Sequence, residues 1–278
     1  MKYHITLLPF SLHKGNKYLY DGNSVIKTRI PYTKHYNYHL TEIASRCLLD
    51  SETDEDDRII KANLNWIMKN LKNGTYHNNF AFPHYPMEKG WVGGLAQGLT
   101  ISVLVYQYKK TKEKKYLSKA NQVFNSLVKN CLYTDGFGNT WINEYPNVNS
   151  ILNGMIYAMF GIYDLYYYTD SAEAGKLWDK CVITLVENLH RYDLPYGSRY
   201  DLVNKYPATE FYHKVHIEQM KELFKLTRYK EFHDYWKKWA KNYSGVRCSM
   251  KKNTMAMSKY GIIDSYKRYK TIKRWNNG

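Results

Sequence analysis

Several features that would place this chain in a common class are missing from its sequence. Only 4 of its 278 residues are cysteine, and no two of them form a Cys-x-x-Cys pair, which disfavours a disulfide framework and a zinc motif. We expect all four to be reduced, mostly buried thiols: Cys47, Cys131, Cys181 and Cys248. Neither the Gly-x-Gly-x-x-Gly motif nor the P-loop motif occurs. Nicotinamide or nucleotide chemistry is therefore disfavoured, and we expect no cofactor.

Long uninterrupted apolar segments are also absent. The stretch 5–12 is short, contains Pro9 and lacks both a cationic start and a small-residue cleavage site, so we expect no signal peptide. The more apolar stretch 151–168 includes Asn153, Gly154 and Asp164, which disfavours a membrane span. The sequence therefore predicts a cytoplasmic protein.

Acidic residues are the minority among the charged ones. The chain has 41 Lys+Arg against 25 Asp+Glu, a net charge of +16, which favours an anionic partner. The segment 245–278 holds nine basic residues against Asp264, so it carries +8 of this total. Such a run is usually a solvated terminus, and the alternative is peripheral membrane association or an anchor on an anionic polymer. No nucleic-acid-binding motif accompanies the charge, so nucleic acid is not an expected partner.

A repeat of about sixty residues organises the chain. Four threonines, each between two apolar segments, recur at a constant spacing of 58 residues: Thr53, Thr111, Thr169 and Thr227. Four prolines precede the first apolar segment of each unit at spacings of 55, 60 and 61: Pro31, Pro86, Pro146 and Pro207. Proline is excluded from helix interiors but suits the position just ahead of a helix. The sequence pattern therefore predicts a pair of helices in each unit.

Apolar residues at helical spacing give the bounds of these pairs. We expect helices at 38–50 and 55–72, 91–109 and 113–130, 150–168 and 171–191, and 210–226 and 228–243. The first helix of each pair is the more apolar and is expected to be the inner one. Long connections at 73–90, 131–149 and 192–209 lie opposite the threonine turns, and connections of that length are commonly functional.

The predicted fold class is thus all-α. We expect an α/α toroid, an incomplete barrel of about four helical hairpins, with the long loops forming a cleft at one end. The expected organisation is a short N-terminal segment over 1–30, the toroid over 31–244 and a basic C-terminal tail over 245–278.

Several separate motifs resemble, in the same order, the C-terminal domain of the D-glucuronyl C5-epimerases. The motifs lie at 95–104, 141–146 (Trp-Ile-Asn-Glu-Tyr-Pro), 152–154, 161–165, 198–202 (Ser-Arg-Tyr-Asp-Leu) and 211–213 (Phe-Tyr-His). The resemblance covers about 32–243. It implies a toroid that converts glucuronate to iduronate in an acidic polysaccharide of the heparosan type, without a redox cofactor. Because no signal peptide is expected, a lipid-linked glycan in the cytoplasm is the other substrate considered.

The resemblance also implies four catalytic-site residues: Glu144, Tyr145, Tyr200 and Tyr212. Removing the C5 proton of a uronate leaves an enolate on the C6 carboxylate, so a base, an acid on the opposite face and charge neutralisation are needed. Our hypothesis is that Glu144 and Tyr212 form the opposed acid/base pair, while Tyr145 and Tyr200 support the carboxylate or the proton path. A tyrosine has a pKa of about 10, so acting as a base would require nearby cations.

Some of these candidates have an alternative structural interpretation. Tyr145 precedes a proline, as do Tyr85 and Tyr206 in other units, so it could simply form a corner of the fold. Glu144 has no acidic counterpart in those units, which favours a role specific to the site. Gln97 and Asn153 could donate to the substrate carboxylate or satisfy a neighbouring helix.

The sequence departs from the family pattern at two arginines. Val203 and Thr209 stand where the family usually has Arg, so the uronate would be held by Arg199, Lys205 or Lys214, or the substrate would differ. His216 lies three residues after His213, with no third metal ligand at a recognisable spacing. We expect no metal site and favour sugar hydrogen bonding or a core role for His216.

The leading functional interpretation is a cofactor-independent C5-epimerase acting on a uronate-containing glycan. A polysaccharide lyase is the close alternative, because β-elimination starts with the same C5 proton abstraction. A non-catalytic glycan-binding module is the third possibility, suggested by the missing arginines. The sequence leaves a homodimer open.

Overall fold

The computed structural model describes residues 18–30, 35–49, 53–82, 85, 87–148, 150–195 and 197–241. The basic segment 245–278, Cys248, Pro31 and Pro86 lie outside these residues, as does most of the segment 1–30. Cys47, Cys131 and Cys181 are free and buried, as predicted. In the described part of the chain, no helix combines the length and apolarity needed to cross a membrane.

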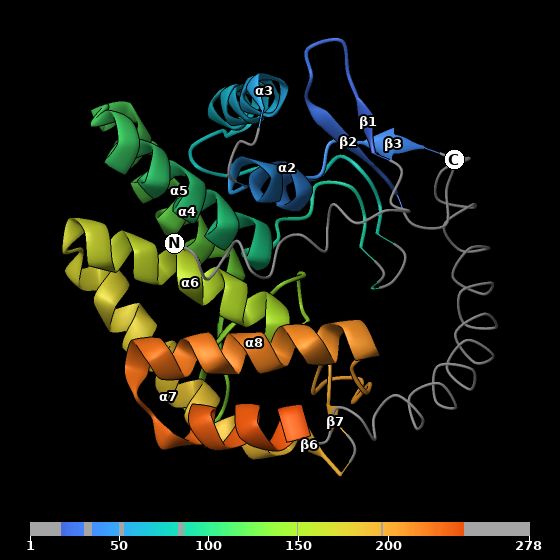
Figure 1. Cartoon of the computed structure of the whole chain (residues 1–278), viewed down its shortest axis with the longest axis vertical. Coiled ribbons are helices and arrows are strands. Elements are labelled where there is room, and N and C mark those ends of the chain that lie inside the picture. The colour runs from blue at the N-terminus through green and yellow to red at the C-terminus, as the bar shows by residue number, and fades with distance from the viewer. Residues whose placement is uncertain are drawn as a thin grey trace.

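The helices form consecutive pairs (Figure 1). The inner helices are α2 (Leu40–Cys47), α4 (Gly94–Thr111), α6 (Leu152–Thr169) and α8 (Glu210–Thr227). Their outer partners are α3 (Asp54–Asn70), α5 (Lys114–Cys131), α7 (Ala172–Tyr192) and a helical segment over 230–241. Each inner helix contacts the next, and α2, α4 and α6 also contact their own partners. The predicted helices and the mainly helical toroid are confirmed, with boundaries shifted by a few residues.

Burial separates the inner helices from the outer ones. α4 is buried continuously from Gly94 to Val105, and α6 from Leu152 to Ile162. By contrast, α5 buries a single stripe: Tyr116, Ala120, Val123, Phe124, Ser126, Leu127 and Cys131. A helix that is apolar all round must be covered on all sides, whereas an amphipathic helix covers the core with one face. The order of apolar and charged segments along the chain therefore positions both layers.

Glycine allows α4 and α6 to cross at very short range. A Cβ added at Gly98 would lie 2.3 Å from the Ala158 Cα, and one added at Gly161 would lie 2.0 Å from the Gly98 carbonyl oxygen. No side chain fits at either position without moving the backbone. These two glycines thus set the spacing of the central pair of inner helices.

The threonine repeat marks equivalent turns in three of the four units. Thr111, Thr169 and Thr227 each end an inner helix and donate a hydroxyl hydrogen bond to the carbonyl four residues earlier. The next residue in each case adopts a left-handed conformation: Lys112, Asp170 and Arg228, with φ of 61°, 52° and 64°. The repeated threonine therefore marks the same local structure three times.

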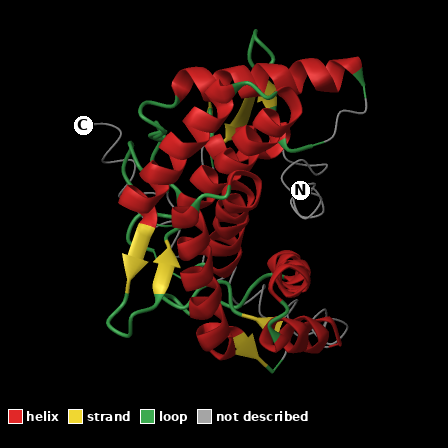
Figure 2. Cartoon of the chain, turned by 90° about the vertical axis from the view of Figure 1, so that its left-hand side faces the viewer, coloured by secondary structure: helices red, strands yellow, loops and turns green. Residues whose placement is uncertain are grey.

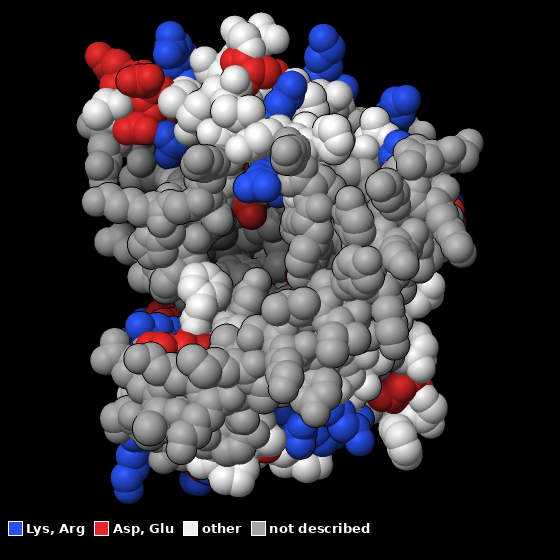
Figure 3. All heavy atoms as spheres, turned by 90° about the vertical axis from the view of Figure 1, so that its right-hand side faces the viewer, with Lys and Arg blue, Asp and Glu red and all other residues white. Residues whose placement is uncertain are grey.

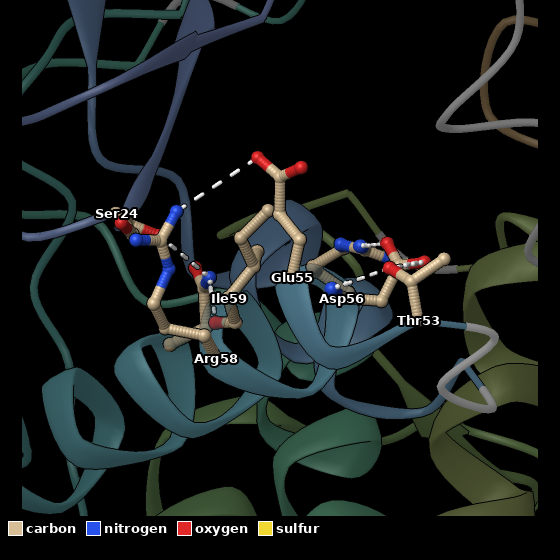
Figure 4. Close-up of polar contacts among 8 residues, drawn as sticks. Ser24, Thr53, Glu55, Asp56, Arg58 and Ile59 are labelled. Atoms are coloured by element: carbon tan, nitrogen blue, oxygen red, sulfur yellow. Dashed lines mark hydrogen bonds and ion pairs between the residues drawn. The ribbon is translucent and has the colours of Figure 1, made fainter.

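Thr53 does not share this position. It is the N-cap of α3, where its hydroxyl oxygen accepts the Asp56 N–H at 3.0 Å and its hydroxyl hydrogen is directed to the Asp56 carboxylate (Figure 4). Capping of this kind satisfies a backbone donor that has no partner within the helix. The 58-residue spacing therefore relates the start of one outer helix, at Thr53, to the ends of three inner helices.

Short antiparallel strands occupy segments for which no strands were predicted. β1 (Leu19–Tyr20), β2 (Ile26–Arg29) and β3 (Tyr36–Asn37) form a three-stranded sheet in which Leu19 pairs with Lys27 and Thr28 with Asn37. The connection after α5 contains β4 (Leu132–Thr134) and β5 (Thr140–Ile142), and the one after α7 contains β6 (Asp193–Leu194) and β7 (Gly197–Ser198). Two of the three expected long connections therefore begin with a short hairpin, and the fold is mainly helical, as predicted.

The whole arrangement is an open arc of helices (Figure 2). Figure 2 views the molecule from the end with the short turns, and the hairpins β6–β7 and β1–β3 lie at the other end, on the right of Figure 1. We call these the short-turn end and the long-loop end.

Candidate active site

The four predicted catalytic residues lie at the long-loop end, on segments that converge there. Glu144 and Tyr145 follow β5, Tyr200 follows β7, and Tyr212 is in the first turn of α8. Backbone hydrogen bonds tie these segments to the inner helices: Leu152 donates to the Tyr200 carbonyl at 3.1 Å, and Gly94 to the Asn143 carbonyl at 3.0 Å. Figure 3 views the molecule from this end and shows a hollow near the centre of this face.

Glu144 is buried, with 7% of its surface exposed. Its carboxylate lies directly against α6, because a Cβ added at Gly154 would be only 1.9 Å from the Glu144 Oε2 atom. Among the described residues, Oε2 has no hydrogen-bond partner. Burial raises the pKa of Glu144 from its usual 4.5 to about 7, and a hydrogen bond with Tyr145 opposes this shift. The carboxyl group can therefore exchange a proton near neutral pH.

Tyr145 is enclosed by aromatic rings. Its ring stacks on Phe82 with centroids 5.1 Å apart, and it contacts Tyr85 at 5.1 Å and Trp91 at 5.6 Å. Burial, followed by the charge of Glu144, raises its pKa well above the usual tyrosine value. Tyr145 therefore occupies a packed corner of the fold and also contacts the site carboxylate.

Tyr200 and Tyr212 form a second pair. Their ring centroids are 4.7 Å apart, with an interplanar angle of 58°. Burial raises the pKa of Tyr212 to about 12; the nearby charge of Glu144 adds to the shift, and a hydrogen bond with Tyr200 opposes it. The pKa of Tyr200 is also raised well above its usual value, by burial first and then by Glu144. Both phenols therefore keep their protons at neutral pH.

A buried polar network supports the backbone next to this pair. The Ser198 hydroxyl lies 2.8 Å from Nδ1 of both His213 and His216, and both imidazoles face the Trp239 ring at 5.9 and 6.3 Å. All four residues are buried. The environment of His216 is therefore that of the core, and its sugar-binding role remains only a prediction.

The other predicted binding residues have other neighbours. The Gln97 amide donates to the Gly74 carbonyl at 3.1 Å and to the Ser126 hydroxyl at 2.7 Å, which directs it toward α5. Arg199 donates to the Lys205 carbonyl at 3.0 Å, close to the exposed Lys205 side chain.

Asn153 lies next to Gly154, and its backbone carbonyl accepts from Gln219 at 3.0 Å. Its side-chain oxygen is buried without a hydrogen-bond partner among the described residues. The structure thus brings Glu144, Tyr145, Tyr200 and Tyr212 together, and gives Gln97 and His216 structural partners.

Three further residues belong to this cluster but were not predicted. Tyr157 lies on α6 one turn after Gly154, is buried, and interacts electrostatically with both Tyr212 and Glu144. Tyr85 is buried and directs its hydroxyl to the Asp201 carboxylate at 3.5 Å. Burial also raises the pKa of Asp201. The sequence could have indicated Tyr157, because it lies three residues after Gly154 and residues at this spacing share one face of a helix.

The charges that act on the cluster are acidic or phenolic. In the part of the chain that the structure describes, no Lys or Arg contributes to the pKa shift of Glu144. The same residues contain no group of three or more His, Cys, Asp and Glu side chains placed to hold a metal ion. The site is thus a buried carboxyl group surrounded by tyrosines.

Comparison with known proteins identifies the family. A family model described as the D-glucuronyl C5-epimerase C-terminus matches residues 69–241. An uncharacterized protein of Methanocaldococcus jannaschii is 30% identical over 201 residues, 68% of this chain and 61% of that protein. The D-glucuronyl C5-epimerase of Caenorhabditis elegans is 26% identical over 240 residues, 76% of this chain and 36% of that protein. The chain thus spans less than two thirds of the length of both relatives.

A solved structure supports the fold independently of the sequence. A GH76 α-mannanase of Bacteroides thetaiotaomicron superposes with a TM-score of 0.57 at 12% identity, covering 87% of this chain and 71% of that one. At this identity the likeness concerns the α/α toroid alone. The family-model match over most of the helical body, supported by the C. elegans relative, establishes that the chain belongs to the D-glucuronyl C5-epimerase C-terminal domain family.

Proposed function

We propose that the protein is a cofactor-independent C5-epimerase that converts glucuronate to iduronate residues in an acidic polysaccharide or lipid-linked glycan. The observation that carries the proposal is the buried cluster in which Glu144 interacts electrostatically with Tyr145, Tyr200 and Tyr212. Family membership supports the same class of reaction.

The protonation states in the cluster suit this chemistry. Glu144, with a pKa of about 7, is partly ionised at neutral pH, whereas Tyr212, with a pKa of about 12, is protonated. In the proposed step the Glu144 carboxylate takes the C5 proton, and the electron pair of the C–H bond forms an enediolate with the C6 carboxylate. Tyr212 then donates its phenolic proton to C5 from the opposite face. The centre is inverted with no net change in electrons.

The remaining two tyrosines would support the two proton-transfer groups. Tyr145 is hydrogen-bonded to Glu144, and Tyr200 to Tyr212. Transfer of the proton held by Glu144 to the Tyr212 phenolate restores the starting state. Neutralising the C6 carboxylate is proposed for the cations that neighbour Tyr200 and Tyr212 in the sequence: Arg199, Lys205 and Lys214.

The test is incubation of the protein with heparosan in deuterium oxide, followed by NMR at C5. We expect deuterium at C5 together with iduronate signals. Glu144→Gln and Tyr212→Phe should each lower the exchange rate by about 10²-fold or more, the range for losing a positioned acid or base. Tyr133→Phe, at an exposed position on β4, serves as the matched control and should keep the parent rate.

Two outcomes would contradict the proposal. Ultraviolet absorbance from an unsaturated uronate, without iduronate, would assign a lyase. Absence of C5 exchange with glucuronate polymers, while the polymer still binds to the parent and to Glu144→Gln, would assign a glycan-binding module.

A further inference from the structure

A cluster of exposed tyrosines lies at the short-turn end, away from the candidate active site. It is formed by the last turns of α4 and α6, two helices in direct contact. We call it the Tyr/Lys patch, and its members are Tyr106, Lys109, Tyr163, Tyr166, Tyr167 and Tyr168. Three of them expose large aromatic surface: 37% for Tyr106, 41% for Tyr166 and 61% for Tyr167. Large rings are normally covered, so exposed rings gathered at one place indicate a binding surface.

The rings of the patch are held in a defined arrangement. Tyr167 stacks on Tyr163 with centroids 5.7 Å apart and planes 20° apart, and it meets Tyr168 edge-on at 5.0 Å. Tyr163 packs in turn on Trp178 of α7 at 4.8 Å. Rings that are already fixed by packing lose little conformational entropy when a ligand binds, which is typical of aromatic recognition surfaces.

A lysine ammonium group completes the patch. Lys109 Nζ lies 4.6 Å from the centre of the Tyr168 ring and donates to the Tyr168 hydroxyl at 3.1 Å. Among the described residues, the groups that act on the charge of Lys109 are tyrosines, with no carboxylate among them, and its side chain is exposed. An ammonium has three donors, so two remain for a ligand.

We propose that the Tyr/Lys patch binds a second segment of the acidic glycan that is acted on at the Glu144 site, which rests on the function proposed above. The apolar C–H faces of pyranose rings stack on exposed aromatic rings, and the Tyr hydroxyls can hydrogen-bond to sugar hydroxyls. The free donors of Lys109 suit a uronate carboxylate. Tyr167 lies 13 residues after Gly154 on α6, a helical rise of about 20 Å, so the two sites are separate.

The surroundings of the patch favour a narrow polymer over a membrane. Asp170 is exposed at the end of α6, and the acidic first turn of α3 lies at the same end, where Lys110 interacts with Asp57. A flat anionic lipid surface would meet these carboxylates, whereas a single glycan chain would contact only the Tyr/Lys patch. The match between the positive charge of the protein and the negative charge of the glycan is therefore confined to the Tyr/Lys patch.

The test compares binding of long and short glycans to the parent and to the double variant Tyr167→Ala, Lys109→Gln. Size-fractionated heparosan is immobilised on a sensor, and a short heparosan oligosaccharide is titrated in solution. A polymer that engages two sites gains affinity through effective concentration. The double variant should therefore bind long chains at least tenfold more weakly at low salt, with unchanged affinity for the short oligosaccharide. The matched control is Tyr229→Ala, Lys129→Gln, which should bind like the parent.

Three results would overturn this proposal. The first is equal binding of long chains by the parent and the double variant. The second is an equal loss for long and short glycans at an unchanged Tm, which would mean that the patch is not a second site separate from the one that binds the short oligosaccharide. The third is that the double variant, compared with the parent, loses binding to vesicles that contain anionic lipid while its binding to the polymer is unchanged. The binding assay does not depend on catalysis. If the protein showed no C5 exchange but its polymer binding still depended on the patch, only the proposed catalysis would be rejected.

Discussion

At residue 154, Glu144 occupies the space that a Cβ would fill. The Cβ of Gly154→Ala would lie 1.9 Å from Oε2, 2.6 Å from Cδ and 2.8 Å from Cβ of Glu144, so the carboxylate must leave its position. A misplacement of about 1 Å is enough to cost about 10²-fold in rate. We therefore expect Gly154→Ala to lower kcat by about that factor with little change in KM, measured by C5 deuterium exchange on a heparosan substrate.

A glycine in open space provides the control for this substitution. A Cβ added at Gly136 has no heavy atom within 4 Å, so Gly136→Ala should keep the parent kcat. Parent-like turnover by Gly154→Ala would mean that the position of Glu144 does not matter for catalysis.

The raised pKa of Glu144 predicts that the free energy of unfolding of the protein depends on pH. Because burial raises its pKa from 4.5 to about 7, the folded state binds the proton more tightly than the unfolded state. The free energy of unfolding contributed by this group is therefore highest below pH 4.5, falls as pH rises to 7, and is constant above that. A shift of this size corresponds to up to about 3 kcal/mol.

Glu144→Gln removes this titration while keeping the size of the side chain. We expect it to be more stable than the parent by up to about 3 kcal/mol at pH 8, with almost no difference near pH 4. Urea unfolding of both proteins at the two pH values measures this, and titrations of other groups cancel in the comparison. A constant difference across pH would show that Glu144 titrates normally in the folded protein.

At the scale of elements, local patterns predicted the helices but not what lies between them. The helical spacing of apolar residues is a local property, so the four pairs were predicted within a few residues of α2 to α8 and the segment 230–241. The hairpins β4–β5 and β6–β7 were not, because strands of two or three residues are too short to show an alternating pattern.

The same distinction holds within the site. The motifs predicted that Glu144, Tyr145, Tyr200 and Tyr212 would meet, and the structure brings them together. The direction of a side chain depends on tertiary packing, so the sequence could not show that Gln97 is hydrogen-bonded to Gly74 and Ser126. The resemblance that identified the motifs gave no indication of Tyr157, which lies between two of them.

At the scale of the whole molecule, the arc is open (Figure 2), and its two halves meet where α4 crosses α6. A Cβ at residue 161 would lie 2.0 Å from the Gly98 carbonyl oxygen and 2.6 Å from its carbonyl carbon. These are backbone atoms, which cannot rotate away as a side chain can, so Gly161→Ala must separate the two helices. Overpacking typically costs about 1–3 kcal/mol, against a gain of about 1 kcal/mol from replacing a helical glycine by alanine.

Because the clash at residue 161 involves backbone on both sides, we expect a cost at the upper end of this range, so Gly161→Ala should lower the free energy of unfolding by about 2 kcal/mol, measured by urea denaturation. The urea dependence should stay equal to that of the parent if the molecule still unfolds as one unit. A reduced urea dependence would mean instead that the half containing α2 to α5 unfolds separately from the half containing α6 to α8. Unchanged stability would mean that the two helices can move apart without loss, and that the glycine crossing does not hold the two halves together.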